Sequence, residues 1–321
     1  MPAQDYIGLQ GPPYEMDVER GKIREFARAM NAYLPEFLEG RNPIVPATFL
    51  ITTQYVWGYT LERPRGTVFA QIDHDFSVPL HAEESFIFHG MPPRAGARLI
   101  CHPSLEDVRI KQGSKGGELT FLTLLNQYFD ENGRLAVEQR SVTVTTEQSP
   151  EDAEWQVDIP PYDPAYTDLD PNQPFAHLQR VEWEALVEEE GPGAISTGPL
   201  LIQDMVRFQG VEGEDNPLHF DTIWAAKNGY PAVFGLGMHQ ASVLASYAAH
   251  WLDPTAVRKV RIRFPNVYWP GEEMIYQGSV TRKYIDPDTQ HRLADLELIC
   301  TRPPNKVLVK VWMTLDFGVQ L

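Results

Sequence analysis

The chain has 321 residues, of which 43% are hydrophobic, and it carries a formal net charge of −17 at pH 7. A chain of this length can bury a substantial core and corresponds to about two domains of ordinary size. The sequence contains no basic face of the kind that nucleic-acid-binding proteins use, so a nucleic-acid partner is not expected.

The apolar segments do not suggest membrane insertion or secretion. The longest, residues 233–252, is interrupted by glycine, histidine and glutamine, so it is not expected to span a membrane. The first residues lack a basic start followed by an apolar run, which argues against a secretory signal peptide and predicts a cytoplasmic location. Cys101 and Cys300 lie far apart in strand-like segments and are expected to pack in the core.

In chain order, the first half is expected to hold one central helix followed by long antiparallel strands. Apolar residues of helical period follow Pro46, which predicts a helix over Thr48–Tyr59. Two runs rich in β-branched and aromatic residues, 117–129 and 134–146, flank an Asp-Glu-Asn-Gly turn and predict a pair of strands.

A proline-rich, acidic segment separates the two halves of the chain. Residues 148–199 contain eight prolines, and residues 151–190 contain twelve acidic side chains against one basic side chain. Such a composition is typical of an extended connection. The predicted organisation is an N-terminal domain over residues 1–149, a linker over 150–199 and a C-terminal domain over 200–321.

The second half repeats the pattern of the first. Pro46 and Phe49 match Pro231 and Phe234 at an offset of 185 residues, and a second group of matches follows at an offset of 188. A helix is predicted over Gly235–Leu252, followed by strands over 291–301 and 306–317. One helix wrapped by a curved antiparallel sheet is the hot-dog arrangement, so the predicted fold class is α+β, a double hot-dog whose two lobes pair within one chain.

The most informative local pattern lies in the second half, where Glu214 and Asp215 precede Asn216, Pro217 and His219. A carboxylate five residues before a histidine, across an Asn-Pro turn, allows both side chains to converge on one water molecule. This arrangement indicates general acid/base chemistry. The alternative is that His219 and the turn only close a loop.

Residues 213–225 resemble the signature of the MaoC-like, or R-specific, enoyl-CoA hydratase family, Gly-Asp-x-Asn-Pro-[Leu/Ile/Val]-His-x5-[Ala/Ser]. Residues 11–29 and 115–145 are similar to the N-terminal lobe of the family's double hot-dog members, a FAS1-like dehydratase domain. The counterpart of the loop 213–225 in the first half, residues 31–46, lacks the acid and histidine pair, so the N-terminal lobe is expected to be catalytically silent. The resemblance places the catalytic acid on Glu214 and the base on His219. The family has aspartate where this chain has Glu214, so the neighbouring Asp215 remains an alternative acid.

The same resemblance implies substrate contacts around the start of the second central helix. Gly235 is the candidate for an oxyanion contact through its backbone N–H, because the positive end of a helix dipole suits a developing enolate. Phe234 stands where many relatives have histidine and is assigned, with Asn216, to substrate binding. Arg261 and Arg263 share one face of a predicted strand and are candidates for the phosphates of coenzyme A, with a solvated strand face as the alternative.

These observations predict a hydratase or dehydratase that interconverts a 2-enoyl thioester and a 3-hydroxyacyl thioester. A hot-dog acyl-CoA thioesterase and a non-catalytic subunit that binds an acyl thioester remain alternatives. The expected partner is the thioester of coenzyme A or of an acyl carrier protein, with no metal, no redox cofactor and no membrane. Whether two chains form a homodimer stays open.

Overall fold

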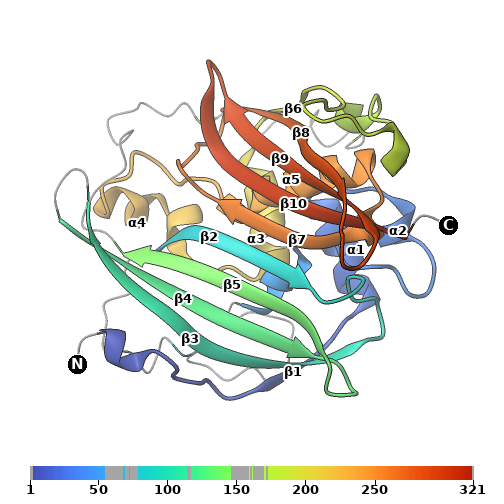
Figure 1. Cartoon of the computed structure of the whole chain (residues 1–321). Helices are drawn as coiled ribbons and strands as arrows, with labels where there is room; N and C mark the ends of the chain where they lie inside the picture. The colour runs from blue at the N-terminus through green and yellow to red at the C-terminus, as the bar shows by residue number, and fades with distance from the viewer. Residues whose placement is uncertain are drawn as a thin grey trace.

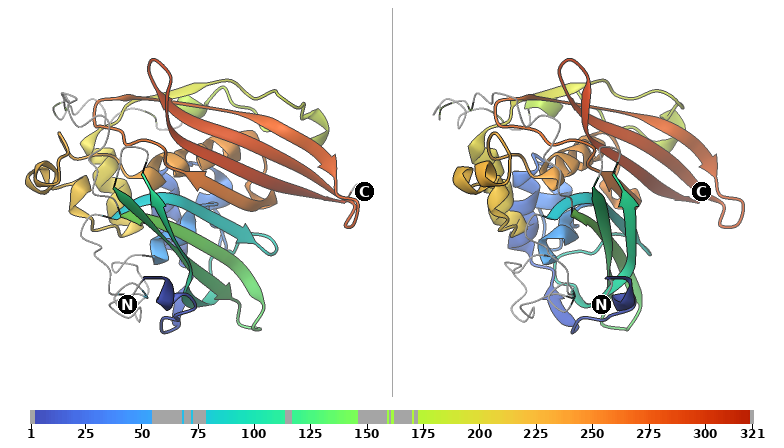
Figure 2. Two further views of the ribbon diagram at one scale, coloured as in Figure 1. Left: turned by 60° about the vertical axis from the view of Figure 1, so that its left-hand side comes forward. Right: turned by 90° about the vertical axis from the view of Figure 1, so that its left-hand side faces the viewer.

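A computed structural model describes residues 3–54, 68, 72, 79–113, 117–145, 159, 161, 170 and 173–319. Within these residues the strands form one antiparallel sheet of ten, and the helices gather on one of its faces (Figure 1, Figure 2). The strands are β1 (Tyr14–Asp17), β2 (Pro79–Phe88), β3 (Arg98–Gln112), β4 (Glu118–Phe129), β5 (Leu135–Thr145), β6 (Ile195–Pro199), β7 (Val257–Arg263), β8 (Glu273–Ile285), β9 (His291–Arg302) and β10 (Lys306–Val319).

Five α-helices and several short 3-10 helices accompany the sheet in the described part of the chain. The α-helices are α1 (Arg20–Ala29), α2 (Pro35–Leu38), α3 (Ile202–Glu212), α4 (Thr222–Lys227) and α5 (Gly237–Trp251). The 3-10 helices are η1 (Ala3–Tyr6), η2 (Phe49–Thr53), η5 (Gln173–Phe175), η6 (Trp183–Ala185), η7 (Pro217–His219) and η8 (Pro254–Ala256). None of the helices among these residues is long and apolar enough to cross a membrane.

The sheet order confirms the predicted double hot-dog. From one edge to the middle it runs β1-β3-β4-β5-β2, and from the other edge to the middle it runs β6-β8-β9-β10-β7. The same order of equivalent strands therefore occurs twice, and β2 and β7 meet in the centre. Their antiparallel register runs from Glu83 opposite Arg263 to Ile87 opposite Lys259, so one sheet continues from the first half into the second.

Helix α5 is the central helix of the second half, close to the predicted range Gly235–Leu252. Almost every residue of the helix is buried, and the helix contacts β8, β9 and β10. A helix that is apolar or small on all sides is typical of a core position. Both cysteines are also buried, as expected, and neither forms a disulfide within the described residues.

The central helix predicted over Thr48–Tyr59 is described only in part. Residues Phe49–Thr53 form the 3-10 helix η2, and the stretch from Tyr55 to Tyr59 lies outside the described residues. Thr48 Oγ1 and Ser242 Oγ share a hydrogen bond of 2.8 Å, which joins the start of η2 to α5. The two halves therefore meet through their core helices as well as through the sheet.

Part of the range predicted as a linker lies in the sheet. Strand β6 pairs with β8 through Ile195 opposite Tyr276, and the Ile195 side chain is buried. Upstream, Trp183 lies against Lys283 and donates its indole N–H to the Leu293 carbonyl at 3.0 Å. The proline and acid content of this segment could not predict these contacts, because the partner residues lie about 100 positions later in the chain.

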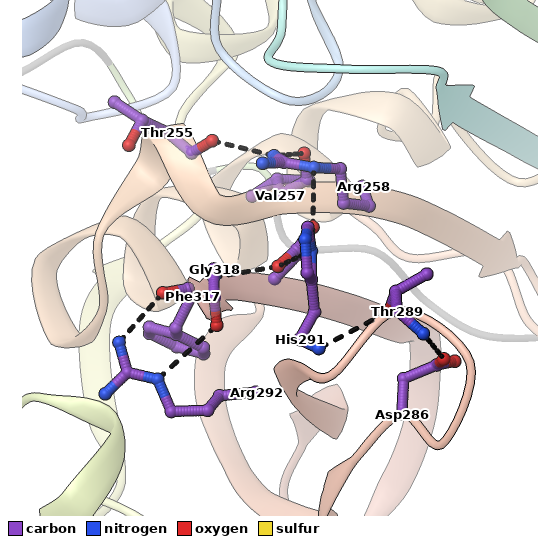
Figure 3. Close-up of polar contacts among 10 residues, drawn as sticks. Thr255, Val257, Arg258, Asp286, Thr289, His291, Arg292, Phe317 and Gly318 are labelled. Atoms are coloured by element: carbon purple, nitrogen blue, oxygen red, sulfur yellow. Dashed lines mark hydrogen bonds and ion pairs between the residues drawn. The ribbon is translucent and has the colours of Figure 1, made fainter. Parts of the chain in front are cut away.

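A polar cluster joins three strands at one end of the second half (Figure 3). The Asp316 carboxylate of β10 accepts from His291 Nδ1 of β9 at 2.9 Å and lies 3.5 Å from Arg258 Nε of β7. Arg292 donates to the Phe317 carbonyl at 3.0 Å. These bonds tie the first residues of β7 and β9 to the last residues of β10.

Candidate active site

Helix α3 carries the candidate acid/base loop at its C-terminal end. The helix buries Met205, Phe208, Gln209 and Glu212, which share one face at positions i, i+3, i+4 and i+7. It ends at Gly213, whose φ of 85° is left-handed and favours glycine. The chain therefore turns sharply just before Glu214.

The loop that follows is held by its own polar side chains. Glu214 Oε1 accepts a hydrogen bond of 2.9 Å from the Asn216 N–H, and Asn216 Oδ1 accepts one of 3.1 Å from the Leu218 N–H. Pro217 occupies the first position of η7, where its missing N–H costs nothing. Asn216 thus caps η7, and the Glu214 carboxylate is held through one of its oxygens.

His219 is held in one orientation by its neighbours. Its Nδ1 lies 2.8 Å from the Phe234 carbonyl oxygen, and its ring meets the Phe234 ring edge-on with centroids 4.9 Å apart. Because a carbonyl only accepts, Nδ1 carries the proton and Nε2 presents a lone pair. Burial lowers the pKa of His219, although Glu214 and the bond to Phe234 act in the opposite direction. A neutral imidazole with a free Nε2 is a suitable general base.

The two candidate acids differ in their surroundings. Glu214 is partly buried and acts electrostatically on His219, whereas Asp215 is exposed. A partly buried carboxylate that interacts with the base is in better reach of a common water than one that faces solvent. The geometry therefore favours Glu214 over Asp215 as the partner of His219.

Aromatic rings form one wall beside His219. Phe234 is buried and contacts Tyr230 at 4.9 Å and Trp269 at 6.2 Å between ring centroids. Gly235 follows, and its N–H donates to the Tyr268 carbonyl at 2.9 Å. The amide predicted as an oxyanion contact therefore already has an acceptor in this structure.

Gly235 is also required by packing. A Cβ atom at this position would lie 1.9 Å from Cε2 of Tyr268, a ring that is buried and hydrogen-bonded to the Leu236 carbonyl. We expect Gly235→Ala to lower the free energy of unfolding by about 1–3 kcal/mol, measured by urea unfolding. Gly210→Ala is the matched control, because a Cβ there meets nothing within 4 Å and alanine favours the helix. An equal effect of both changes would contradict the packing argument.

Arg261 and Arg263 lie on β7, next to the junction of the two halves. Arg263 Nη2 is 2.7 Å from Glu83 Oε1, and Arg261 Nη2 is 3.3 Å from Glu83 Oε2. Arg261 also stacks over Trp312, with its guanidinium carbon 5.3 Å from the ring centroid. Both side chains stay about half exposed, so each keeps N–H groups that face solvent.

Comparison with protein families agrees with this organisation. Residues 6–139 match the model of the FAS1-like, dehydratase domain region, and residues 186–294 match the model of the MaoC like domain. Together the two models cover most of the chain, and the second includes the whole loop from Gly213 to Ala225. The chain therefore combines a FAS1-like dehydratase region with a MaoC-like domain.

Solved structures of MaoC-like proteins share the fold at low sequence identity. One described as a MaoC-like dehydratase is 23% identical with a TM-score of 0.75, and the match covers 98% of this chain and 100% of that chain. A putative MaoC domain protein dehydratase from Chloroflexus aurantiacus J-10-fl is 10% identical with a TM-score of 0.65, covering 98% and 96%. A conserved hypothetical protein of Mycobacterium tuberculosis with a double hotdog fold is 12% identical with a TM-score of 0.58, covering 97% and 96%. No curated protein matches the chain.

Sequence reasoning missed some polar groups of this MaoC-like protein that lie next to the loop. Glu212 and Glu84 are each 1% exposed, and both act electrostatically in the same region. A signal was present for Glu212, since it continues the buried spacing of Met205 and Phe208 along α3. The contribution of Glu84 could not be predicted, because nothing local indicates that a strand of the first half brings a carboxyl group close enough to act on Glu212.

Proposed function

We propose that this MaoC-like protein is a hydratase or dehydratase that interconverts a 2-enoyl thioester and a 3-hydroxyacyl thioester. The observation that carries the proposal is the neutral His219, whose free Nε2 lies in the same loop as the partly buried Glu214 carboxylate. A base and a carboxylate on one short loop can hold a water molecule and transfer its proton.

The proposed reaction needs only the side chains of this loop and backbone dipoles. In hydration, the water oxygen bonds to the β-carbon, the water gives up a proton to the Glu214 and His219 pair, and the α-carbon takes up a proton. Negative charge develops on the thioester oxygen as the first bond forms, and the N-terminal end of α5 is suited to stabilise it. We assign Gly235 and Phe234 to the substrate-binding wall beside His219. We assign Asn216 to holding the loop. Dehydration reverses the same steps.

A panel of enoyl thioesters of different chain length tests the proposal. Hydration removes the enoyl absorbance without releasing free thiol. Release of free thiol instead would favour a thioesterase, and saturable binding without any turnover would favour a non-catalytic binding subunit. The loop sequence favours hydration, because Glu214, Asn216 and His219 occupy the positions of the family's signature.

The arginines of β7 are proposed to bind the phosphates of the thioester carrier. Replacing both Arg261 and Arg263 by alanine is expected to raise KM for a coenzyme A thioester several-fold more than KM for a pantetheine thioester, and to weaken the dependence on salt. Steady-state kinetics with the two substrates measure this. Equal changes in KM would mean that these arginines only pair with Glu83.

The remaining assignments are proposals of the same kind. We place the catalytic loop in the C-terminal domain and regard the N-terminal domain as silent in proton transfer. The carrier is coenzyme A or an acyl carrier protein, and turnover of the same enoyl group on each carrier separates the two. A cytoplasmic location is a prediction for localisation experiments, and sedimentation decides between a monomer and a homodimer.

A further inference from the structure

Three carboxyl groups from both halves of the chain come together beneath the candidate loop. Glu212 ends α3, Glu214 follows two residues later, and Glu84 comes from β2 in the first half. Glu212 interacts electrostatically with both of the others. Glu84 and Glu212 are each 1% exposed, so water does not screen this interaction effectively.

The three groups differ in the partners that could hold a negative charge. Glu84 Oε2 accepts from Ser141 Oγ at 2.6 Å and lies 2.9 Å from His81 Nε2. Glu214 accepts from the Asn216 N–H. Glu212 Oε1 is buried without a hydrogen-bond partner, and no described lysine or arginine forms an ion pair with Glu212.

A buried carboxylate without a cation or donor is strongly disfavoured, and two like charges nearby increase the penalty. Tyr268, in the segment after β7, also interacts electrostatically with Glu212, and burial raises the pKa of this phenol well above its ordinary value. Burial, reinforced by Glu214 and Glu84, raises the pKa of Glu212 well above its ordinary value. Glu84 Oε1 is also buried without a partner, but Glu84 and Glu214 each accept a hydrogen bond through their other oxygen, so a negative charge at Glu212 has the least support of the three.

We propose that Glu212 is a positioning residue that stays a neutral carboxylic acid between Glu84 and Glu214, so that the candidate site holds a single reactive carboxylate beside His219. The first half of the chain then contributes to the site through Glu84, although it does not touch the reacting atoms. A second negative charge at Glu212 would oppose the charge that develops on the thioester oxygen. The catalytic part of this inference rests on the proposed function, whereas the protonation of Glu212 does not.

Thermal unfolding between pH 5 and pH 9 tests the protonation directly. In the unfolded chain Glu212 ionises near its ordinary pKa of about 4.3, so the wild type loses stability as pH rises above that value towards the raised pKa of the folded state. Glu212→Gln cannot ionise, and its Tm relative to the wild type is expected to increase with pH by a few degrees. Glu131→Gln, which removes an exposed carboxyl in the β4–β5 turn, is the control for net charge and is expected to show no such trend.

Infrared spectroscopy provides a second readout. At pH 7 the carbonyl band of a protonated carboxylic acid is expected in the wild type and in Glu131→Gln, and its loss is expected in Glu212→Gln. A Tm of Glu212→Gln that falls relative to the wild type as pH rises, or an unchanged carbonyl band, would mean that Glu212 is ionised in the folded protein and would overturn the inference.

Turnover as a function of pH tests the positioning role. We expect the activity of the wild type to fall at the alkaline pH where the Tm difference stops increasing, and the fall to be absent in Glu212→Gln. Identical pH profiles across that range would overturn the positioning role and leave the hydratase proposal intact. If no enoyl thioester is turned over, the proposed function fails, while the unfolding and infrared results still decide whether Glu212 is protonated.

Discussion

Replacing His219 by alanine is expected to lower kcat/KM for an enoyl thioester by about 10² to 10⁴. The reason is that His219 Nε2 carries the lone pair that can accept a proton, whereas Nδ1 donates its hydrogen bond to the Phe234 carbonyl. Loss of the enoyl absorbance measures the rate. Full activity of His219→Ala would contradict the hydratase proposal itself.

Glu214→Gln is expected to cause a loss of similar size, because the carboxylate and the imidazole act on the same water molecule. For the same reason the double variant should be little slower than either single one. Asp215→Asn is the matched control on the same loop, since its side chain is exposed. If Asp215→Asn abolishes turnover and Glu214→Gln retains it, the assignment of the acid is wrong.

Replacing Arg302 by methionine is expected to lower the free energy of unfolding by about 3–5 kcal/mol. Arg302 at the end of β9 is 5% exposed and forms an ion pair with Glu272, which also accepts from the Trp269 N–H at 2.9 Å. Without the guanidinium, a largely buried carboxylate loses the ion pair that Arg302 provides.

Urea unfolding measures the loss, with Arg109→Met as the control. Arg109 pairs with Asp107 on the same strand, but both side chains are well exposed, so solvent replaces the ion pair and little stability is lost. Similar losses for the two variants would show that burial of the Arg302 pair does not determine its contribution.

The strands and the second central helix were predictable from the sequence because their patterns are local. The runs 134–146, 291–301 and 306–317 became β5, β9 and β10 with shifts of one or two residues, since alternating apolar residues match the two faces of a half-buried strand. The stretch 235–252 became α5 because a continuous run of apolar and small residues suits a helix buried on all sides.

The candidate loop was predictable for a different reason, and only in part. Glu214, Asn216 and His219 are close in sequence, so a short turn necessarily brings them together. The acceptor for the Gly235 N–H, the Tyr268 carbonyl, is 33 residues away and has no local signal. The same holds for Glu83, which pairs with Arg261 and Arg263 only because β2 and β7 are neighbours in the sheet.

The pairing of β2 with β7 has a consequence for synthesis of the chain. During translation one edge of β2 has no partner until β7 leaves the ribosome about 170 residues later, on the order of ten to thirty seconds at typical rates. An open strand edge of this kind can pair with other chains. Two adjacent acidic residues of β2, Glu83 and Glu84, reduce that hazard on the nascent chain. A chain that ended after β5 would keep this edge permanently, so aggregation of the isolated first half is the outcome that its topology favours.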